Sequence, residues 1–198
     1  ASYPTFDPHI FNPDTQYNVN AVFQRLTADQ RSPLQNKAVA EQYTPGSVYK
    51  IVTALAAASE DVWQPDQIFN CALEWHGQER FGDALEVRYD WRILNALEEA
   101  GEITMTQALT SSCNPFFWEM GALMFQKDPN ILNEYAQLLG FGRPIGLNVL
   151  GREASGNLAD PAVSTQAINN AIGQGDVSVT AVQMAQATAL IANGGKLY

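Results

Sequence analysis

The segment that most constrains the fold is the Pro45–Gly46 turn together with the apolar run behind it. Ser47 follows this turn directly, and Lys50 comes three residues later. The apolar residues of the run recur at the spacing of one helical face: Val48, Ile51, Val52 and Leu55. Because residues three apart are neighbours on a helix surface, the pattern predicts a helix over residues 46–59 with Ser47 beside Lys50 in its first turn.

Ser47 and Lys50 are therefore a candidate nucleophile and base. A serine hydroxyl needs a neighbouring base to become a nucleophile, and a lysine becomes a base when burial lowers its pKa. We expect both side chains at the edge of the apolar stripe, half out of water and at the positive end of the helix dipole. The alternative interpretation is ordinary helix chemistry, because Ser is a good N-cap and Lys a good helix residue.

Length and charge exclude several classes of protein. The chain has 198 residues, enough for one domain or two small ones, and we treat residues 1–198 as a single domain. Its net charge is −10 and the acidic excess is spread along the chain without a basic stripe, which argues against nucleic-acid binding. No apolar run reaches the length needed to span a bilayer.

The cysteines and histidines do not predict a metal site. Cys71 and Cys113 are too few for a disulfide framework or for a zinc site built from cysteines alone, and His9 and His76 complete no ligand spacing. Two free, partly buried thiols are the default expectation. A bond between the two cysteines requires an oxidising compartment.

Periodicity and capping signals predict a mainly helical chain with a few short strands. Helices are predicted over residues 19–26, 46–59, 91–100, 104–109, 129–139, 162–171 and 181–192, and one more beginning at Pro115. Asn114 is the predicted cap of the Pro115 helix. Short strands are predicted over residues 69–71 and 85–88, a long surface loop over 141–160, and the start of a strand at Lys196.

Two further segments follow the Ser47 helix in order. Ser112 and Asn114 flank Cys113 just before Pro115. Gly173, Gln174 and Gly175 form a tight turn shortly before a capping box at Thr180. Taken alone, Ser112 and Asn114 are typical of helix capping.

The segments in this order resemble the transpeptidase domain of penicillin-binding proteins, in which Ser-x-x-Lys is followed by a Ser-x-Asn motif. The sequence is also similar to that of the family over residues 1–8, 43–50, 108–114, 171–185 and 192–195. The resemblance implies the helical portion of the β-lactamase/transpeptidase-like α/β fold, with most of the central sheet missing.

The activity implied by this resemblance is serine acyl transfer without a cofactor. Ser47 would attack a D-alanyl-D-alanine stem peptide or a β-lactam, and Lys50 would take its proton. Ser112 would relay a proton toward the leaving group, and Asn114 would hold the substrate amide and Lys50. The turn formed by Gly173, Gln174 and Gly175 would bind substrate.

One departure from the family pattern limits this expectation. The chain contains no Lys-Thr-Gly or Lys-Ser-Gly, a motif that in the family lies on a strand downstream of where these residues stop. We therefore expect a partial transpeptidase domain with weak or no turnover unless flanking strands of the same protein complete the sheet. The resemblance also implies an extracytoplasmic location, anchored to the cytoplasmic membrane through a segment outside these residues.

Other functions stay open at this point. A serine β-lactamase needs a deacylating base, and Glu153 with Asn157 has the spacing of such a pair, although a solvated loop acid is the simpler interpretation. Cys113 stands where class A β-lactamases carry Asp, which favours the penicillin-binding group. A non-catalytic β-lactam sensor or scaffold domain is the remaining alternative.

Overall fold

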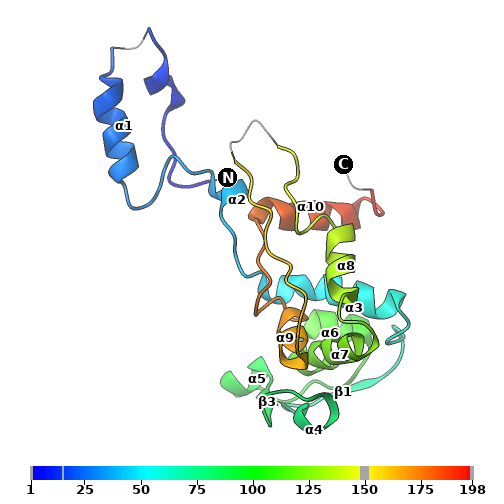
Figure 1. Ribbon diagram of the computed structural model, residues 1–198. Coiled ribbons are helices and arrows are strands. Elements are labelled where there is room, and N and C mark those ends of the chain that lie inside the picture. The colour runs from blue at the N-terminus through cyan, green and yellow to red at the C-terminus, as the bar shows by residue number, and fades with distance from the viewer. Residues whose placement is uncertain (1, 15, 148–151, 197–198) are drawn as a thin grey trace.

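The computed structural model describes residues 2–14, 16–147 and 152–196. In this part of the chain the fold is mainly helical, with two small antiparallel sheets (Figure 1). The helices are η1 (Pro8–Phe11), α1 (Val19–Ala28), α2 (Lys37–Ala40), η2 (Gly46–Tyr49), α3 (Lys50–Ser59), α4 (Gln78–Phe81), α5 (Trp91–Leu94), α6 (Met105–Ser111), α7 (Asn114–Lys127), α8 (Ile131–Leu138), α9 (Ser164–Asn170) and α10 (Ala181–Ala192). The strands are β1 (Phe69–Cys71), β2 (Glu74–Trp75), β3 (Arg88–Tyr89) and β4 (Gly101–Ile103). The predicted fold class is confirmed.

Helix α7 is the centre of the core. Apolar side chains occur on every side of it, and Phe116, Phe117 and Met120 are completely buried, as expected for a helix surrounded by other elements. Figure 1 shows α3, α6, α8 and α9 gathered around it. Gly121 lets α9 approach closely, because a Cβ there would lie 2.6 Å from the Cβ of Ala171.

The two sheets lie at the end of the body that holds α4 and α5 (Figure 1). In one, β1 pairs with β4 and sets Cys71 opposite Gly101. In the other, β2 pairs with β3 and sets Trp75 opposite Arg88. These short pairings bring residues 69–103 against α7, and so position Cys71 next to the second predicted motif.

The N-terminal segment with α1 stands away from this body in Figure 1. Helix α1 buries none of its residues, and its Phe23 ring packs edge-on against Phe11, with ring centres 6.3 Å apart. Phe11 in turn contacts Phe6 in the same T-shaped way. A small aromatic cluster therefore holds η1 to α1.

Most predicted elements are present within one or two residues. β1 spans the residues predicted for it, and α1, α9 and α10 cover the predicted stretches closely. Thr180 and Gln183 form the predicted capping box, each side chain bonded to the other's backbone N–H. None of the described helices is long and apolar enough to cross a membrane.

The helix predicted over residues 91–100 was wrong in length, because α5 ends at Leu94. Ala96 has a left-handed φ of 51°, which breaks the helix. Gly101 then begins β4, where it pairs with Cys71, instead of ending a helix. The strand predicted over 85–88 was displaced, and the pairing starts at Arg88.

The cap of α7 was also assigned to the wrong residue. The Cys113 sulfur accepts the Phe116 N–H at 3.3 Å, and Asn114 is already the first helical residue. Pro115 keeps its predicted place in the first turn. The strand predicted to start at Lys196 falls mostly on residues 197–198, which lie outside the described residues. The N-terminal match over residues 1–8 begins at Ala1, which also lies outside them.

Candidate active site

Ser47 lies on the 3₁₀ turn η2, which runs directly into α3. In a 3₁₀ turn the side chains of residues i and i+3 eclipse one another, so Ser47 and Lys50 point the same way. The Ser47 side chain is exposed, whereas Lys50 is only 1% exposed. The expectation of two half-exposed side chains was therefore wrong for Lys50, which the rest of the domain covers.

Of the apolar stripe that predicted α3, only Val52 lies on the buried face of the helix. Val48, Ile51 and Leu55 are 54%, 42% and 41% exposed, while Val52 is buried. The buried face consists instead of Val52 with small residues and Lys50. Periodicity located the helix but did not show which side faces the core.

Residues 111–114, here called the second-motif turn, join α6 to α7 and supply the partners of Lys50. Lys50 Nζ donates to Ser112 O at 2.9 Å, Ser112 Oγ at 3.0 Å and Asn114 Oδ1 at 2.5 Å. Ser112 Oγ in turn donates to Ser47 Oγ at 3.1 Å. The structure thus brings together all of the predicted catalytic side chains: Ser47, Lys50, Ser112 and Asn114.

Burial makes the Lys50 amine easier to deprotonate than that of an exposed lysine. Burial lowers the pKa of the Lys50 ammonium to about 8. Two charged residues have smaller effects: Asp90 raises this pKa, and Arg92 lowers it. Nζ also lies 5.2 Å from the centre of the Phe117 ring, a favourable position for a cation. With a pKa near 8, both charge states of Lys50 are populated around neutral pH.

Residues 173–175, here called the glycine turn, contact the same helix start through the backbone. Gly46 N donates to Gly173 O at 2.8 Å. A Cβ on Gly173 would lie 2.2 Å from Gly46 O, and the φ of +68° also favours glycine. Gln174 and Gly175 are exposed beyond this contact.

Sequence reasoning missed the residues that hold the second-motif turn from outside. Asp90 accepts the Asn114 N–H at 2.9 Å, and Arg92 Nη2 donates to Ser111 O at 2.7 Å. Trp91 Nε1 donates to Ser112 O at 3.2 Å. Asp is a common N-cap residue, and Asp90 caps α5. No local signal, however, indicates hydrogen-bond partners about twenty residues further along the chain.

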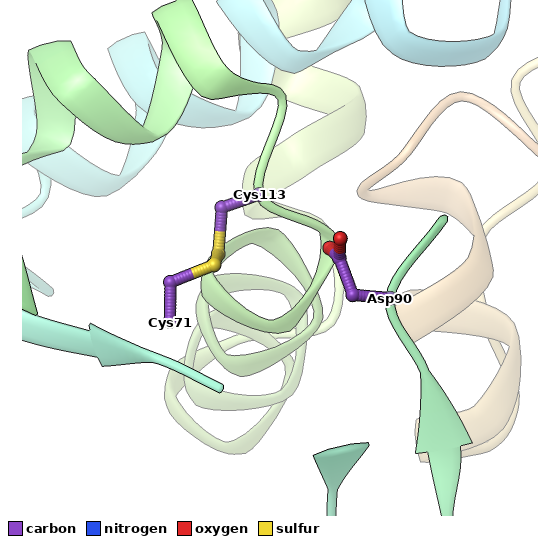
Figure 2. Close-up of side chains that lie close together, drawn as sticks. All are labelled: Cys71, Asp90 and Cys113. Atoms are coloured by element: carbon purple, nitrogen blue, oxygen red, sulfur yellow. A yellow bond between two sulfur atoms is a disulfide. The ribbon is translucent and has the colours of Figure 1, made fainter. Parts of the chain in front are cut away.

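Cys71 and Cys113 form a disulfide, so the expectation of free thiols was wrong. β1 brings Cys71 beside the start of α7, with the two Cα atoms 6.3 Å apart, and both residues are completely buried. Figure 2 shows the bond on one side of the chain that enters α7 and Asp90 on the other. Pairing across two elements 42 residues apart is not visible in the sequence.

The three residues of Figure 2 have the composition of a partial metal site, because their potential ligand atoms lie within 4.8 Å of one another. Both sulfurs are bonded to each other, however, and Asp90 already pairs with Arg92 at 2.8 Å. A thiolate is the metal ligand of cysteine, and a disulfide has none to offer. In this state the cluster is structural.

The candidate deacylating pair has structural partners in the loop over residues 141–160. Glu153 Oε2 accepts the Gly146 N–H at 2.9 Å. Asn157 exchanges backbone hydrogen bonds with Ser178 and donates from Nδ2 to Asp176 O. None of these contacts joins either side chain to Ser47.

Comparison with known proteins decides the family. The family described as "Penicillin binding protein transpeptidase domain" matches residues 3–198. The chain belongs to this family. The match takes in both Ser47 and Lys50 as well as the second-motif turn and the glycine turn.

Individual relatives of this transpeptidase domain agree with the family match. The chain is 29% identical over 210 residues to the peptidoglycan D,D-transpeptidase PbpA of Mycobacterium tuberculosis, covering 98% of the chain and 38% of PbpA. It is 31% identical over 202 residues to the stage V sporulation protein D of Bacillus subtilis, covering 100% and 25%. The imipenem acyl-enzyme complex of penicillin-binding protein A from M. tuberculosis superimposes with a TM-score of 0.78 at 25% identity, over 98% of the chain and 42% of that structure. The chain thus spans well under half the length of these relatives.

Proposed function

We propose that this chain carries the serine acyl-transfer centre of a peptidoglycan D,D-transpeptidase. Its substrates would be D-alanyl-D-alanine stem peptides, and β-lactams would acylate it in their place. The observation that carries this proposal is the hydrogen-bonded path from Ser47 Oγ through Ser112 Oγ to the buried Lys50 Nζ. Relatives named D,D-transpeptidases and an acyl-enzyme structure of a similar protein support it.

The path suggests how Ser47 becomes a nucleophile. With Lys50 neutral, Ser112 Oγ can pass its proton to Nζ and accept the Ser47 proton in return. Ser47 Oγ then bonds to the substrate carbonyl carbon, and the bond from that carbon to the leaving nitrogen breaks. The leaving amine takes a proton back from Lys50 through Ser112, so that charge and protons balance over the step.

The remaining residues would bind and polarise the substrate. Helix geometry leaves the first backbone N–H groups of η2 without intrahelical acceptors, and we assign the Ser47 N–H to the developing oxyanion. Asn114 Oδ1 accepts from Lys50, and we assign its Nδ2 to a substrate amide. Gly173, Gln174 and Gly175 would line the opposite side of the bound peptide.

We also propose that flanking strands of the same protein pack on the exposed apolar surface formed by η2 and α3. Val48 and Ile51 form a shallow groove there with Met184 and Ile191 of α10. Such contiguous apolar surface is typical of a site that another element covers. A hydrophobic dye should bind the 198-residue chain through this surface and bind less to a longer form of the polypeptide, whereas equal binding would argue against it.

The buried disulfide supports an extracytoplasmic location, because such bonds persist in oxidising compartments. A domain that acts on peptidoglycan must also face the wall. Anchoring to the cytoplasmic membrane through a segment outside these residues stays a prediction of the family resemblance.

Covalent labelling tests the proposed nucleophile. A fluorescent penicillin should label the longest available form of the polypeptide, and intact-protein mass spectrometry should show one added penicilloyl group. Ser47→Ala should abolish the label. Ser178→Ala is the matched control, since Ser178 Oγ donates to Gln42 and not into this path. Persistent labelling of the Ser47→Ala protein would rule Ser47 out.

The fate of the adduct separates the alternatives. A transpeptidase should keep the penicilloyl group for long periods and should release D-alanine from a stem peptide when an acceptor amine is added. Rapid hydrolysis of the adduct would instead indicate a β-lactamase. Labelling without D-alanine release would indicate a sensor, and no labelling at all a scaffold.

A further inference from the structure

Asp90 is a buried carboxylate that the acyl-transfer path does not use. It is 1% exposed and lies just before α5. Its Oδ1 accepts from Arg92 Nη1 at 2.8 Å and from the Arg92 backbone N–H at 3.0 Å. Its Oδ2 accepts the Asn114 N–H at 2.9 Å. A buried carboxylate is costly unless its oxygens are hydrogen-bonded or paired with a cation. The partners of Asp90 therefore indicate its role.

The Asp90–Arg92 pair contacts both ends of the second-motif turn. Arg92 Nη2 donates to the carbonyl of Ser111, where the turn begins, and Asp90 accepts the N–H of Asn114, where it ends. Between these contacts the chain passes through Ser112, whose φ of +51° is left-handed and unusual for a residue with a side chain. A turn of this kind persists only when its surroundings hold it.

All three hydrogen-bond acceptors of Lys50 that the structure describes belong to the same turn. They are Ser112 O, Ser112 Oγ and Asn114 Oδ1. A displacement of the turn would therefore move every one of them relative to Nζ, and would also move the hydroxyl that links Lys50 to Ser47.

We propose that Asp90 is a positioning residue that holds the second-motif turn against Lys50. This role is independent of the disulfide, which restrains Cys113 from the opposite side of the chain entering α7 (Figure 2). It deepens the proposed acyl-transfer function, on which the kinetic part of its test rests. The hydrogen bonds of Asp90 go to Arg92 and Asn114 and not to Ser47, so it acts through these two residues.

The charges around Lys50 make its pKa a test of this role, because a loss of stability alone would not shift that pKa in a defined direction. Asp90 raises the Lys50 pKa, and Arg92 lowers it, beneath the larger effect of burial. The other partners of Nζ are neutral: the Ser112 and Asn114 oxygens and the Phe117 ring. Replacing Asp90 by Asn removes the raising charge and leaves that of Arg92. The Lys50 titration, and with it the rise of acylation, should then move to lower pH.

Asp90→Asn is the direct test and Asp83→Asn its matched control. Asp83 is a similarly buried carboxylate, 3% exposed, and pairs with Arg88, but its other partners are Thr165 of α9 and the Leu85 backbone. Both variants leave a buried arginine without its ion-pair partner. Only Asp90→Asn weakens the restraint on the second-motif turn, because its amide keeps a single acceptor oxygen for the Arg92 and Asn114 donors.

Penicillin acylation of Ser47 is measured from about pH 6 to about pH 10 in both variants. Asp90→Asn should lower the maximal rate about 10²-fold, the loss typical of misplaced reacting groups, and move the midpoint to lower pH. Asp83→Asn should leave the midpoint unchanged and cost much less. Equal rate losses in the two variants, or an unmoved midpoint in Asp90→Asn, would overturn the assignment.

A second readout does not depend on activity. NMR titration of the Lys50 side chain in the 198-residue chain reports its pKa directly, and the Asn114 amide signal reports the turn. Asp90→Asn should shift both and Asp83→Asn neither. If the unmodified protein does not acylate, the proposed function fails while this titration still decides the role of Asp90.

A double variant covers the case in which Asp90→Asn does not fold. Asp90→Asn with Arg92→Met removes both charges of the pair, so no buried ion is left alone. The Lys50 titration should then stay near that of the unmodified chain, while the Asn114 amide signal still shifts and acylation still falls. An unchanged amide signal and acylation rate in the double variant would refute a positioning role.

Discussion

The start of α3 is bordered by two turns that are held in opposite ways. The second-motif turn is restrained by side chains: a disulfide at Cys113, a carboxylate at Asn114 and three donations from Lys50. The glycine turn is restrained by backbone contact, through the Gly46 N–H and a space at Gly173 too small for a Cβ. The first arrangement responds to redox state, charge and pH. The second responds only to a change of backbone or size.

The largest effect on acylation should follow removal of the Lys50 amine, which donates three hydrogen bonds to the second-motif turn. Lys50→Met keeps the length and apolar stem of the side chain but has no proton acceptor for Ser47. Penicillin acylation should fall by about 10³-fold, within the range of lost general-base catalysis. A stopped-flow or gel-based labelling rate measures this. A loss below about tenfold would mean that Ser47 has another base.

Breaking the disulfide tests the covalent restraint on the same turn. The double variant Cys71→Ser with Cys113→Ser keeps an N-cap oxygen for α7 and removes only the cross-link. For a separation of 42 residues the free energy of unfolding should drop by about 2–4 kcal/mol. Urea denaturation measures it, with the reduced wild-type protein as a control that should behave alike. An unchanged midpoint would show that folding contacts alone restrain Cys113.

The glycine turn should instead be sensitive to a single methyl group. Gly173→Ala places a Cβ 2.2 Å from Gly46 O and should destabilise the fold by about 2–3 kcal/mol, while also displacing Ser47. Gly82→Ala is the matched control, because its φ of +71° is nearly the same and nothing lies within 4 Å of the added atom. Thermal unfolding of both separates the clash from the backbone strain. Equal losses would show that strain is the whole effect.

A change of pH should act through the second-motif turn and leave the glycine turn unaffected. Lys50 must be neutral to accept a proton, and its pKa of about 8 lies well below the usual lysine value. The neutral fraction therefore increases as pH rises, and acylation should increase about tenfold from pH 7 to pH 9 before levelling off. The pH profile of labelling tests this. A profile that is flat over this range would show that Lys50 does not titrate there.

The smallest effect is expected at the exposed tip of the glycine turn. Gln174→Ala changes a side chain that faces solvent, so the free energy of unfolding should stay within about 0.5 kcal/mol. Stem-peptide binding is the sharper measurement, since Gln174 is proposed to line that site. A higher KM with unchanged kcat would support this proposal, and unchanged values of both would remove Gln174 from the substrate site.

The sequence by itself was enough to locate the motifs and most helices. Ser47 and Lys50 follow a Pro-Gly turn, and Thr180 opens a capping box, because such signals act within a few residues. The order of the motifs also indicated the family that the comparison with known proteins established. What these features share is that their physical cause is local.

How these local elements work together depends on the packing of distant segments. This packing buried Lys50, left most of the α3 stripe exposed, and joined Cys71 to Cys113. It also set Asp90 against Asn114, 24 positions further along the chain. Each of these depends on which surfaces meet when distant segments pack, and neither periodicity nor capping carries that information. The local motifs were therefore sufficient to predict the chemistry expected of Ser47. The residues that surround Ser47 and Lys50 come together only through the packing of α3, α6 and α7.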